Sequence, residues 1–215
     1  MTECCRPRGY ERVFTSRQAE RDASRYRRKG LSWAPRRTVE LYGDGVIDGH
    51  TVLEVGGGIG DLQLELLRAG IEHATSIELS GAYEATAERL LDQAGLAERS
   101  ARLVGDAVEG VDGVEPADLV VLHSVVCCYP DPARLLDAVA AKAERHLVVS
   151  YPRSVWWLRA FAPLSNLYPC LRGSDFRFRV HPPAVIVGTV ERAGLALVHN
   201  ERNWVDHLAV FTRPA

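Results

Sequence analysis

A glycine-rich turn behind a short apolar run constrains this chain more than any other feature. Residues 51–55 have the composition of a buried strand, and Asp61 stands where it can cap a helix over residues 62–69. Between the strand and the helix lie four glycines, Gly56, Gly57, Gly58 and Gly60. Such a turn lets a small ligand approach the backbone and the unpaired amides of the helix N-terminus. We therefore predict a ligand site at this strand, turn and helix.

The same alternation continues along the chain. Apolar runs predict further strands at residues 74–78, 101–104, 117–122, 146–151, 195–200 and 207–212. Further helices are predicted at residues 83–94, 131–145 and 183–193. Strands that alternate with helices form a parallel sheet with helices on both faces. The expected fold is α/β and Rossmann-like, with a mostly parallel seven-stranded sheet.

Two segments interrupt this rhythm within an expected single domain. Residues 1–48 carry scattered aromatic side chains among charges and predict an N-terminal helical cap, ahead of a cofactor-binding core over residues 49–151. Residues 152–182 are rich in aromatic residues and arginine, so we expect a substrate-side insertion after the fifth strand. Residues 183–215 then complete the sheet. A chain of 215 residues is long enough to bury one core that serves all four parts.

Composition argues against several classes of protein. No apolar run approaches the roughly 18 residues that a membrane-spanning helix needs, and the N-terminus lacks the apolar stretch of a secretion signal. We therefore expect a cytoplasmic protein whose five cysteines are reduced thiols. The pairs Cys4–Cys5 and Cys127–Cys128 could meet across the site, but adjacent cysteines are poorly spaced for zinc. No metal site is predicted, and the second pair is expected to pack in the core.

Charge is unevenly distributed along the sequence. Residues 1–37 hold 11 Arg or Lys against 4 Asp or Glu, whereas the rest of the chain holds 15 against 24. The basic segment could be a solvated helix that docks on the acidic body, or it could attract an anionic substrate. Nucleic acid is not an expected partner, because the acidic body would repel phosphates and no nucleic-acid-binding motif is present.

Glycine spacing and acidic residues distinguish two kinds of cofactor site. Gly56, Gly58 and Gly60 form G-x-G-x-G, whereas a dinucleotide turn has G-x-G-x-x-G. Glu78 ends the second predicted strand, where a carboxylate can accept hydrogen bonds from both ribose hydroxyls of a nucleotide. With Glu54 ahead of the turn, the run resembles the first motif of class I S-adenosylmethionine-dependent methyltransferases.

Two later elements extend this resemblance. Gly105-Asp106-Ala107 follows the third predicted strand and resembles the element that reads adenine through an Asp side chain and the next amide. Residues 117–123 resemble the fourth-strand motif, after which family members place cofactor and substrate contacts. The resemblance implies the class I methyltransferase fold, S-adenosylmethionine as the cofactor, and a role for Glu54 at its methionine end. The implied cofactor-binding residues are Glu54, Gly56, Gly57, Gly58, Gly60, Glu78, Leu79, Asp106, Ala107 and His123.

Several separated segments are similar to magnesium protoporphyrin O-methyltransferases. These segments are Gly9-Tyr10-Glu11-Arg12, Arg36-Arg37-Thr38-Val39, residues 125–130, Phe161-Ala162-Pro163 and Tyr168-Pro169. The chain departs from that family at Cys128, where the family has His before Tyr-Pro, and at the Trp156-Trp157 pair. The likeness therefore implies the fold and the cofactor, and leaves the substrate open.

Methyl transfer from a sulfonium is an in-line displacement, in which alignment supplies much of the acceleration. A carboxylate acceptor needs no base, whereas a phenol or an ammonium must first lose a proton. His123 and Tyr129 follow the fourth predicted strand, and the carboxyl ends of sheet strands form the ligand crevice. We therefore expect His123 to orient the acceptor or cofactor, and Tyr129 to line the acceptor pocket as a second candidate catalytic residue.

The insertion supplies further candidates for substrate binding. Trp156, Arg177 and Arg179 could clamp a flat or carboxylated acceptor by stacking and charge, with His181 nearby. The insertion could equally be a cap that only packs on protein.

These residues leave three functions open. The leading hypothesis is an S-adenosylmethionine-dependent methyltransferase that acts on oxygen or nitrogen of a small molecule, which could be anionic or aromatic. The alternatives are a magnesium-protoporphyrin-like carboxylate O-methyltransferase and a noncatalytic cofactor-binding module. The G-x-G-x-G spacing and Asp106 argue against a nicotinamide-dependent reductase.

Overall fold

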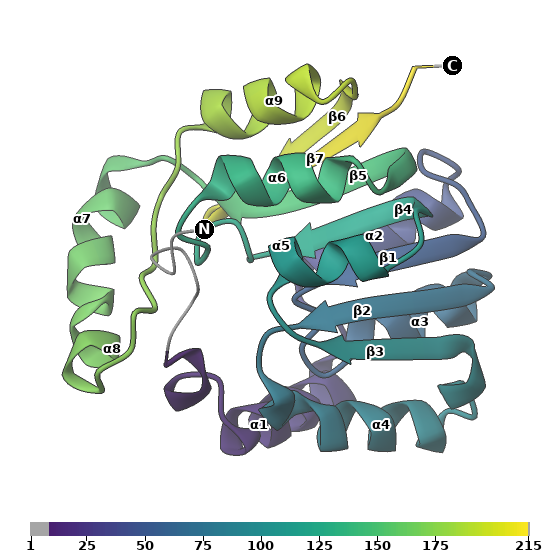
Figure 1. Cartoon of the computed structure of the whole chain (residues 1–215), viewed down its shortest axis with the longest axis horizontal. Coiled ribbons are helices and arrows are strands. Elements are labelled where there is room, and N and C mark those ends of the chain that lie inside the picture. Colours follow the sequence, from purple (N-terminus) through teal and green to yellow (C-terminus); the bar gives the residue numbers. More distant parts are fainter. Residues whose placement is uncertain (1–8, 215) are drawn as a thin grey trace.

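Across the described part of the chain, seven strands form one sheet in the order β3-β2-β1-β4-β5-β7-β6 (Figure 1). The computed structural model describes residues 9–214, so the predicted Cys4–Cys5 pair and residues 1–8 of the predicted cap lie outside it. The strands are β1 (Thr51–Val55), β2 (His73–Glu78), β3 (Ser100–Val104), β4 (Ala117–His123), β5 (Ala143–Pro152), β6 (Ala196–Arg202) and β7 (Asp206–Thr212). Strands β1 to β5 pair in parallel, whereas β7 pairs antiparallel with β5 and β6. The predicted mostly parallel, seven-stranded sheet is confirmed.

Helices cover both faces of this sheet. The α-helices are α1 (Ser16–Lys29), α2 (Trp33–Gly43), α3 (Asp61–Ala69), α4 (Glu84–Gln93), α5 (Ala107–Gly110), α6 (Pro132–Ala140), α7 (Trp156–Ser165), α8 (Leu167–Leu171) and α9 (Pro183–Arg192). Short 3-10 helices are η2 (Tyr10–Arg12), η3 (Gly81–Tyr83), η4 (Ala97–Arg99) and η5 (Val111–Gly113). Buried side chains of α1 to α4 share one core cluster, and those of α5, α6 and α9 share another.

The two core clusters lie on opposite faces because side chains alternate along each strand. In β1, Val52 joins the cluster beneath α1 to α4, and Leu53 joins the cluster beneath α5, α6 and α9. Val121 and Leu122 divide in the same way in β4. A central strand buried on both faces reads as a continuous apolar run, which is the pattern by which these strands were predicted.

Local sequence sets where the principal helices begin. Asp131 accepts a hydrogen bond of 3.1 Å from the amide of Arg134, and Pro132 occupies the first turn of α6. Gly60 adopts a left-handed conformation, with φ of 75°, immediately before α3, and Gly70 follows its last residue.

One predicted helix is too long. The sequence pattern predicts helix over residues 131–145, but α6 ends at Ala140 and β5 begins at Ala143. Ala143 pairs with Ala117 of β4, and the amide of Ala117 donates a hydrogen bond of 2.9 Å to the carbonyl of Lys142. Pairing with a neighbouring strand satisfies the backbone here, so tertiary contacts override the helical preference of an alanine-rich segment.

The segments outside the alternating core are helical. The N-terminal segment forms η2, α1 and α2, and the region predicted as an insertion contains α7 and α8. In Figure 1, α7 and α8 stand beyond the carboxyl ends of the parallel strands and away from the sheet. Every helix found in residues 9–214 is too short or too polar to cross a membrane.

Candidate functional site

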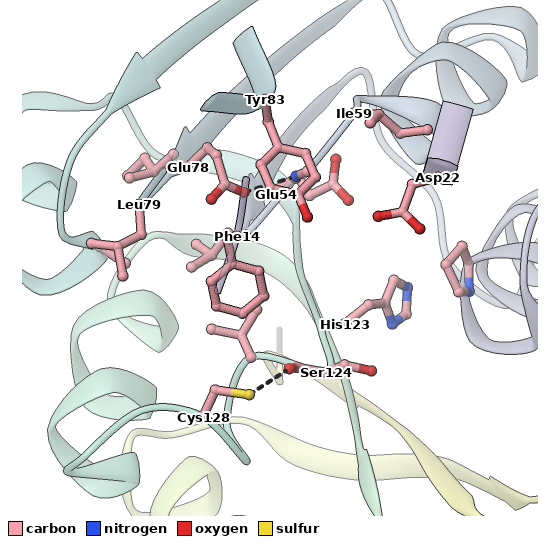
Figure 2. A pocket seen from close by; sticks show the side chains of 18 of the residues that line it. Phe14, Asp22, Glu54, Ile59, Glu78, Leu79, Tyr83, His123, Ser124 and Cys128 are labelled. Atoms are coloured by element: carbon pink, nitrogen blue, oxygen red, sulfur yellow. Dashed lines mark hydrogen bonds between the residues drawn. The ribbon is translucent and has the colours of Figure 1, made fainter. Parts of the chain in front are cut away.

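A cavity of about 400 Å³ lies at the carboxyl ends of β1, β2 and β4 (Figure 2). Its lining includes nine of the ten predicted cofactor-binding residues, all except Gly60, and also includes Tyr129. Parallel strands bring their carboxyl ends to one edge of the sheet, which explains why residues far apart in sequence meet there. The topology therefore gathers the predicted cofactor residues at one site.

Two positions of the glycine turn, Gly56 and Gly57, have no room for a side chain. Gly56 has a φ of +73°, and an added Cβ would lie 2.5 Å from Cγ2 of Val125. At Gly57 an added Cβ would lie 2.5 Å from Oγ of Ser76. Close neighbours exclude a side chain at both positions, and the positive φ of Gly56 also favours glycine there. Both residues line the cavity.

Glu54 is a buried carboxyl group beside this turn. Its Oε2 atom has no hydrogen-bond partner among the described residues, and neither does Oγ of Ser76. Burial raises the pKa of Glu54 to about 8, and the nearby carboxylates of Asp61 and Glu78 raise it further, while Arg102 opposes them. An unpaired buried carboxyl is costly, so this position suits a ligand that brings a positive donor.

Glu78 ties the glycine turn to the end of β2. Its two carboxylate oxygens accept hydrogen bonds of 2.9 Å from the amides of Gly58 and Ser80. These amides hold the carboxylate at the cavity wall, and each oxygen retains a lone pair for a further donor. Glu78 is therefore positioned for a hydroxyl-bearing ligand.

Arg102 on β3 supports the same turn and was not predicted from sequence. Its guanidinium donates a hydrogen bond of 2.8 Å to the carbonyl of Gly58 and forms a salt bridge of 2.9 Å with Glu84. It also donates to Oε1 of Gln63 at 2.9 Å. The Arg102 side chain is only 7% exposed, so removing it would leave Glu84 without its charge partner.

Asp106 and Tyr129 meet across the cavity wall. Asp106 accepts a hydrogen bond of 2.9 Å from the amide of Val108, where it caps α5, and another of 2.9 Å from the hydroxyl of Tyr129. Burial and the Asp106 carboxylate raise the pKa of Tyr129 above its usual range. Tyr129 therefore remains a protonated donor that holds Asp106.

His123 is held between two hydroxyl groups. Its Nε2 lies 3.0 Å from Oγ1 of Thr38, and its Nδ1 lies 3.0 Å from Oγ of Ser150. Since Thr38 donates to the carbonyl of Ala34, the pattern fits a neutral ring with hydrogen on Nε2. Burial lowers the pKa of His123 to about 3, so the ring is a poor proton acceptor at neutral pH.

The remaining predicted substrate residues do not line the cavity. Trp156 is 81% exposed, and Arg177 donates to the carbonyls of Ser174 and Phe176 in its own segment. The backbone amide of Arg179 donates to the carbonyl of Cys127 at 2.8 Å. His181 likewise lies outside the lining. Their predicted contact with an acceptor stays a prediction.

The N-terminal segment contributes lining that sequence motifs did not reveal. Figure 2 shows Phe14 and Asp22 among the cavity-lining side chains, together with Glu54 and His123. Tyr10 donates its hydroxyl hydrogen to the carbonyl of Cys128, which joins this segment to the loop after β4. The basic composition of the N-terminal segment and the resemblance at Gly9-Tyr10-Glu11-Arg12 were its sequence signals, and neither singled out Phe14 or Asp22.

Acidic residues outnumber basic residues in the cavity wall. Within the described chain, six acidic residues and one arginine line it: Asp22, Glu54, Asp61, Glu78, Asp106, Asp206 and Arg25. Asp206 also had no sequence signal. Its hydrogen bonds within the described residues use its backbone, and burial raises the pKa of its carboxyl group. The site is suited to a cationic ligand.

No model of a protein family matches the sequence, and no curated protein matches it. Solved structures do match in fold. Magnesium protoporphyrin IX methyltransferase from Synechocystis PCC 6803, with bound SAH, is 18% identical with a TM-score of 0.69, covering 95% of this chain and 100% of that chain.

Two further solved structures match in fold. An O-methyltransferase family protein from Burkholderia thailandensis is 18% identical with a TM-score of 0.75, covering 98% of this chain and 65% of that chain. The [4+2]-cyclase SpnF is 14% identical with a TM-score of 0.65, covering 83% of this chain and 80% of that chain. Together with the sheet order and the turn after β1, these likenesses show that the chain has the class I methyltransferase fold.

Proposed function

We propose that this chain is an S-adenosylmethionine-dependent methyltransferase that acts on oxygen or nitrogen of a small molecule. One observation carries the proposal: the glycine turn, Glu78 and Asp106 line one cavity with the buried, unpaired carboxyl group of Glu54. This is a nucleotide-binding arrangement with an added site for a positive group. A neighbour in fold that was solved with bound SAH supports the same assignment.

The chemical groups of the lining residues suit the parts of this cofactor. Glu54 would pair with the ammonium of the methionine end, and Glu78 would accept hydrogen bonds from the ribose hydroxyls. Asp106, held by Tyr129, would accept from the adenine amino group. The excess of carboxylates also favours a ligand that carries both an ammonium and a sulfonium. The bound cofactor would supply an electrophilic methyl group.

Asp206 is the proposed general base, which would take the proton that the substrate loses when it accepts the methyl group. His123 has both ring nitrogens occupied and a pKa of about 3, and Tyr129 donates its hydrogen to Asp106. Asp206 lines the cavity together with Ser124, and its hydrogen bonds within the described residues leave the carboxylate oxygens unused. Burial raises its pKa and makes it a better base than a solvated aspartate. His123 would then orient the loop after β4.

The charge of the cavity favours a neutral or cationic acceptor over a carboxylate. With Glu54, Glu78 and Asp106 assigned to the cofactor, the charged residues left in the described lining are Asp22, Asp61, Asp206 and Arg25, which would repel a carboxylate acceptor. A phenol or an amine would face less repulsion and would need the base that Asp206 supplies. Esterification of a porphyrin carboxylate is therefore the second candidate, supported by the likeness in fold to a magnesium protoporphyrin IX methyltransferase.

Isothermal titration with S-adenosylhomocysteine tests the cofactor class, with NADH as the parallel ligand. Micromolar binding of the first alone would support the proposal, whereas binding of NADH alone would overturn it. Methyl transfer from labelled S-adenosylmethionine would then be screened against phenols, amines and carboxylic acids, including protoporphyrins. Product from carboxylic acids alone would favour the second candidate. Tight cofactor binding without any product would favour a noncatalytic module or, as in the [4+2]-cyclase SpnF, another reaction on this fold.

A further inference from the structure

Helices α7 and α8 carry a concentrated set of exposed apolar side chains. Of fourteen large apolar residues that are exposed in the described chain, seven lie on these two helices. They are Trp156, Trp157, Phe161, Leu164, Leu167, Tyr168 and Leu171, with exposed fractions of 42 to 81%. We call this set the α7–α8 surface. Such a concentration on a protein surface marks a site of interaction.

Within residues 9–214, the rest of the fold does not cover this surface. Leu158 is the buried residue of α7, and Pro169 is the buried residue of α8. Figure 1 shows both helices standing apart from the sheet. None of the seven apolar side chains is part of the cavity lining described above. The α7–α8 surface is therefore available to something other than the bound ligand of the cavity.

Residues 152–174, which include α7 and α8, carry only positively charged side chains. Residues 152–174 contain Arg153, Arg159 and Arg172 and no Asp or Glu, although residues 38–215 as a whole hold 15 basic against 24 acidic residues. Arg172 lies over the ring of Tyr168, 5.7 Å from its centroid. Exposed apolar side chains with arginines close by in the sequence suit a partner that has an apolar interior and a negatively charged surface.

A neighbouring loop extends this surface. Trp204 is 87% exposed and lies in the turn between β6 and β7. The amide of Arg153 donates to the carbonyl of Val205 at 2.7 Å, and its guanidinium donates to the carbonyl of Asn203 at 3.0 Å. Arg153 thus joins this loop to the segment from which α7 begins. A third exposed tryptophan therefore lies near the base of the same surface.

We propose that the α7–α8 surface docks on an anionic lipid bilayer. Tryptophan and leucine side chains would enter the boundary between headgroups and acyl chains, while the arginines contact lipid phosphates. The acidic body would be repelled from the same membrane, which sets the orientation of the molecule. A second copy of the chain fits less well, because a two-fold interface would bring the same uncompensated arginines together.

Vesicle sedimentation tests this proposal with the full chain. Wild type should bind vesicles of phosphatidylcholine with one quarter phosphatidylglycerol at least tenfold more tightly than pure phosphatidylcholine vesicles. The double variant Trp156→Ser, Leu171→Ser should lose at least tenfold in binding to the anionic vesicles. Arg159→Gln should lose about fivefold, the effect expected of one basic residue near an anionic membrane. Leu103→Ser and Val198→Ser, which change exposed residues of β3 and β6, are matched controls and should bind as wild type.

A second readout uses wild type and one conservative variant at an exposed residue. Lipids brominated near the headgroup should quench part of the tryptophan fluorescence of wild type, and Trp156→Phe should reduce that quenching. Equal binding of wild type to both vesicle types, or no binding, would overturn the proposal. The proposal would also be overturned if light scattering without lipid showed a dimer and Leu171→Ser dissociated it. Protection of residues 156–171 from hydrogen exchange by S-adenosylhomocysteine alone would instead assign the surface to closure over the cavity, and would also overturn it.

Discussion

The hydroxyl of Tyr129 donates a hydrogen bond of 2.9 Å to the carboxylate of Asp106. The sequence predicts different roles for these residues, Asp106 at the adenine and Tyr129 at the acceptor. The contact positions Asp106, because the hydroxyl hydrogen of Tyr129 is already committed. Tyr129 also lines the cavity, and its predicted contact with an acceptor stays a prediction. The loop after β4 and the loop after β3 are thereby joined at the cavity wall.

Replacement of Tyr129 by Phe tests this contact. Asp106 would keep the amide of Val108 and lose its second donor, so affinity for S-adenosylhomocysteine should weaken severalfold. The free energy of unfolding should fall by about 1 kcal/mol. Calorimetric titration and urea unfolding measure the two effects. Tyr168→Phe, at a tyrosine that is 60% exposed, is the control, and an unchanged affinity in Tyr129→Phe would argue against positioning.

His123 should remain neutral across the physiological range. Its folded pKa of about 3 is below the ordinary value of 6.5, so the unfolded chain binds the proton first as the pH falls. Stability should therefore decrease as the pH falls from 6.5, by at most about 1.4 kcal/mol for each pH unit. His123→Gln should lack this contribution in urea unfolding between pH 5 and 7. A ring resonance of His123 that titrates near pH 6.5 in NMR spectra would contradict the prediction.

Ligand binding at Glu54 should release a proton. With a folded pKa of about 8, Glu54 is mostly protonated at pH 7, and a cationic ligand would favour its ionised form. Titration with S-adenosylhomocysteine in buffers of different ionisation enthalpy measures the release directly. Glu54→Gln should bind more weakly and should release no proton from this site. Equal proton release in wild type and Glu54→Gln would exclude Glu54 as the source.

The same carboxyl group predicts a stability effect of opposite sign to that of His123. The folded pKa of Glu54 is above the ordinary value of 4.5, so its contribution is present at low pH and is lost as the pH rises toward 8. Glu54→Gln should therefore be more stable than wild type at pH 8, and the difference should shrink as the pH falls to 5. Thermal unfolding at both pH values checks this result.

The glycine turn can be tested with a matched pair of substitutions. Gly56→Ala combines a φ of +73° with an added Cβ 2.5 Å from Val125, whereas Gly95→Ala has a φ of +67° and open space. Both variants should lose about 1 to 2 kcal/mol from left-handed strain. Only Gly56→Ala should also lose at least tenfold in affinity for S-adenosylhomocysteine. Equal affinities in the two variants would remove the turn from the binding site.

Most of the fold was predictable from local sequence, because periodicity reflects burial directly. Central strands such as β1 and β4 are buried on both faces and therefore appear as short apolar runs. Turns that need positive φ are marked by glycine, as at Gly56. The end of α6 was missed because the pairing of Ala143 with Ala117 decides it, and that partner is remote in sequence.

The sequence by itself determined the order of strands and helices, the glycine turn and the acidic residues that end the strands, since each depends on neighbours along the chain. Only the tertiary structure decided what those residues contact. Thr38 reaches His123 across 85 positions, and Arg102 reaches Gly58 across 44. The same is true of Asp206, which enters the cavity from β7. These contacts arise from the packing of distant elements, and no local pattern encodes which side chains that packing brings together.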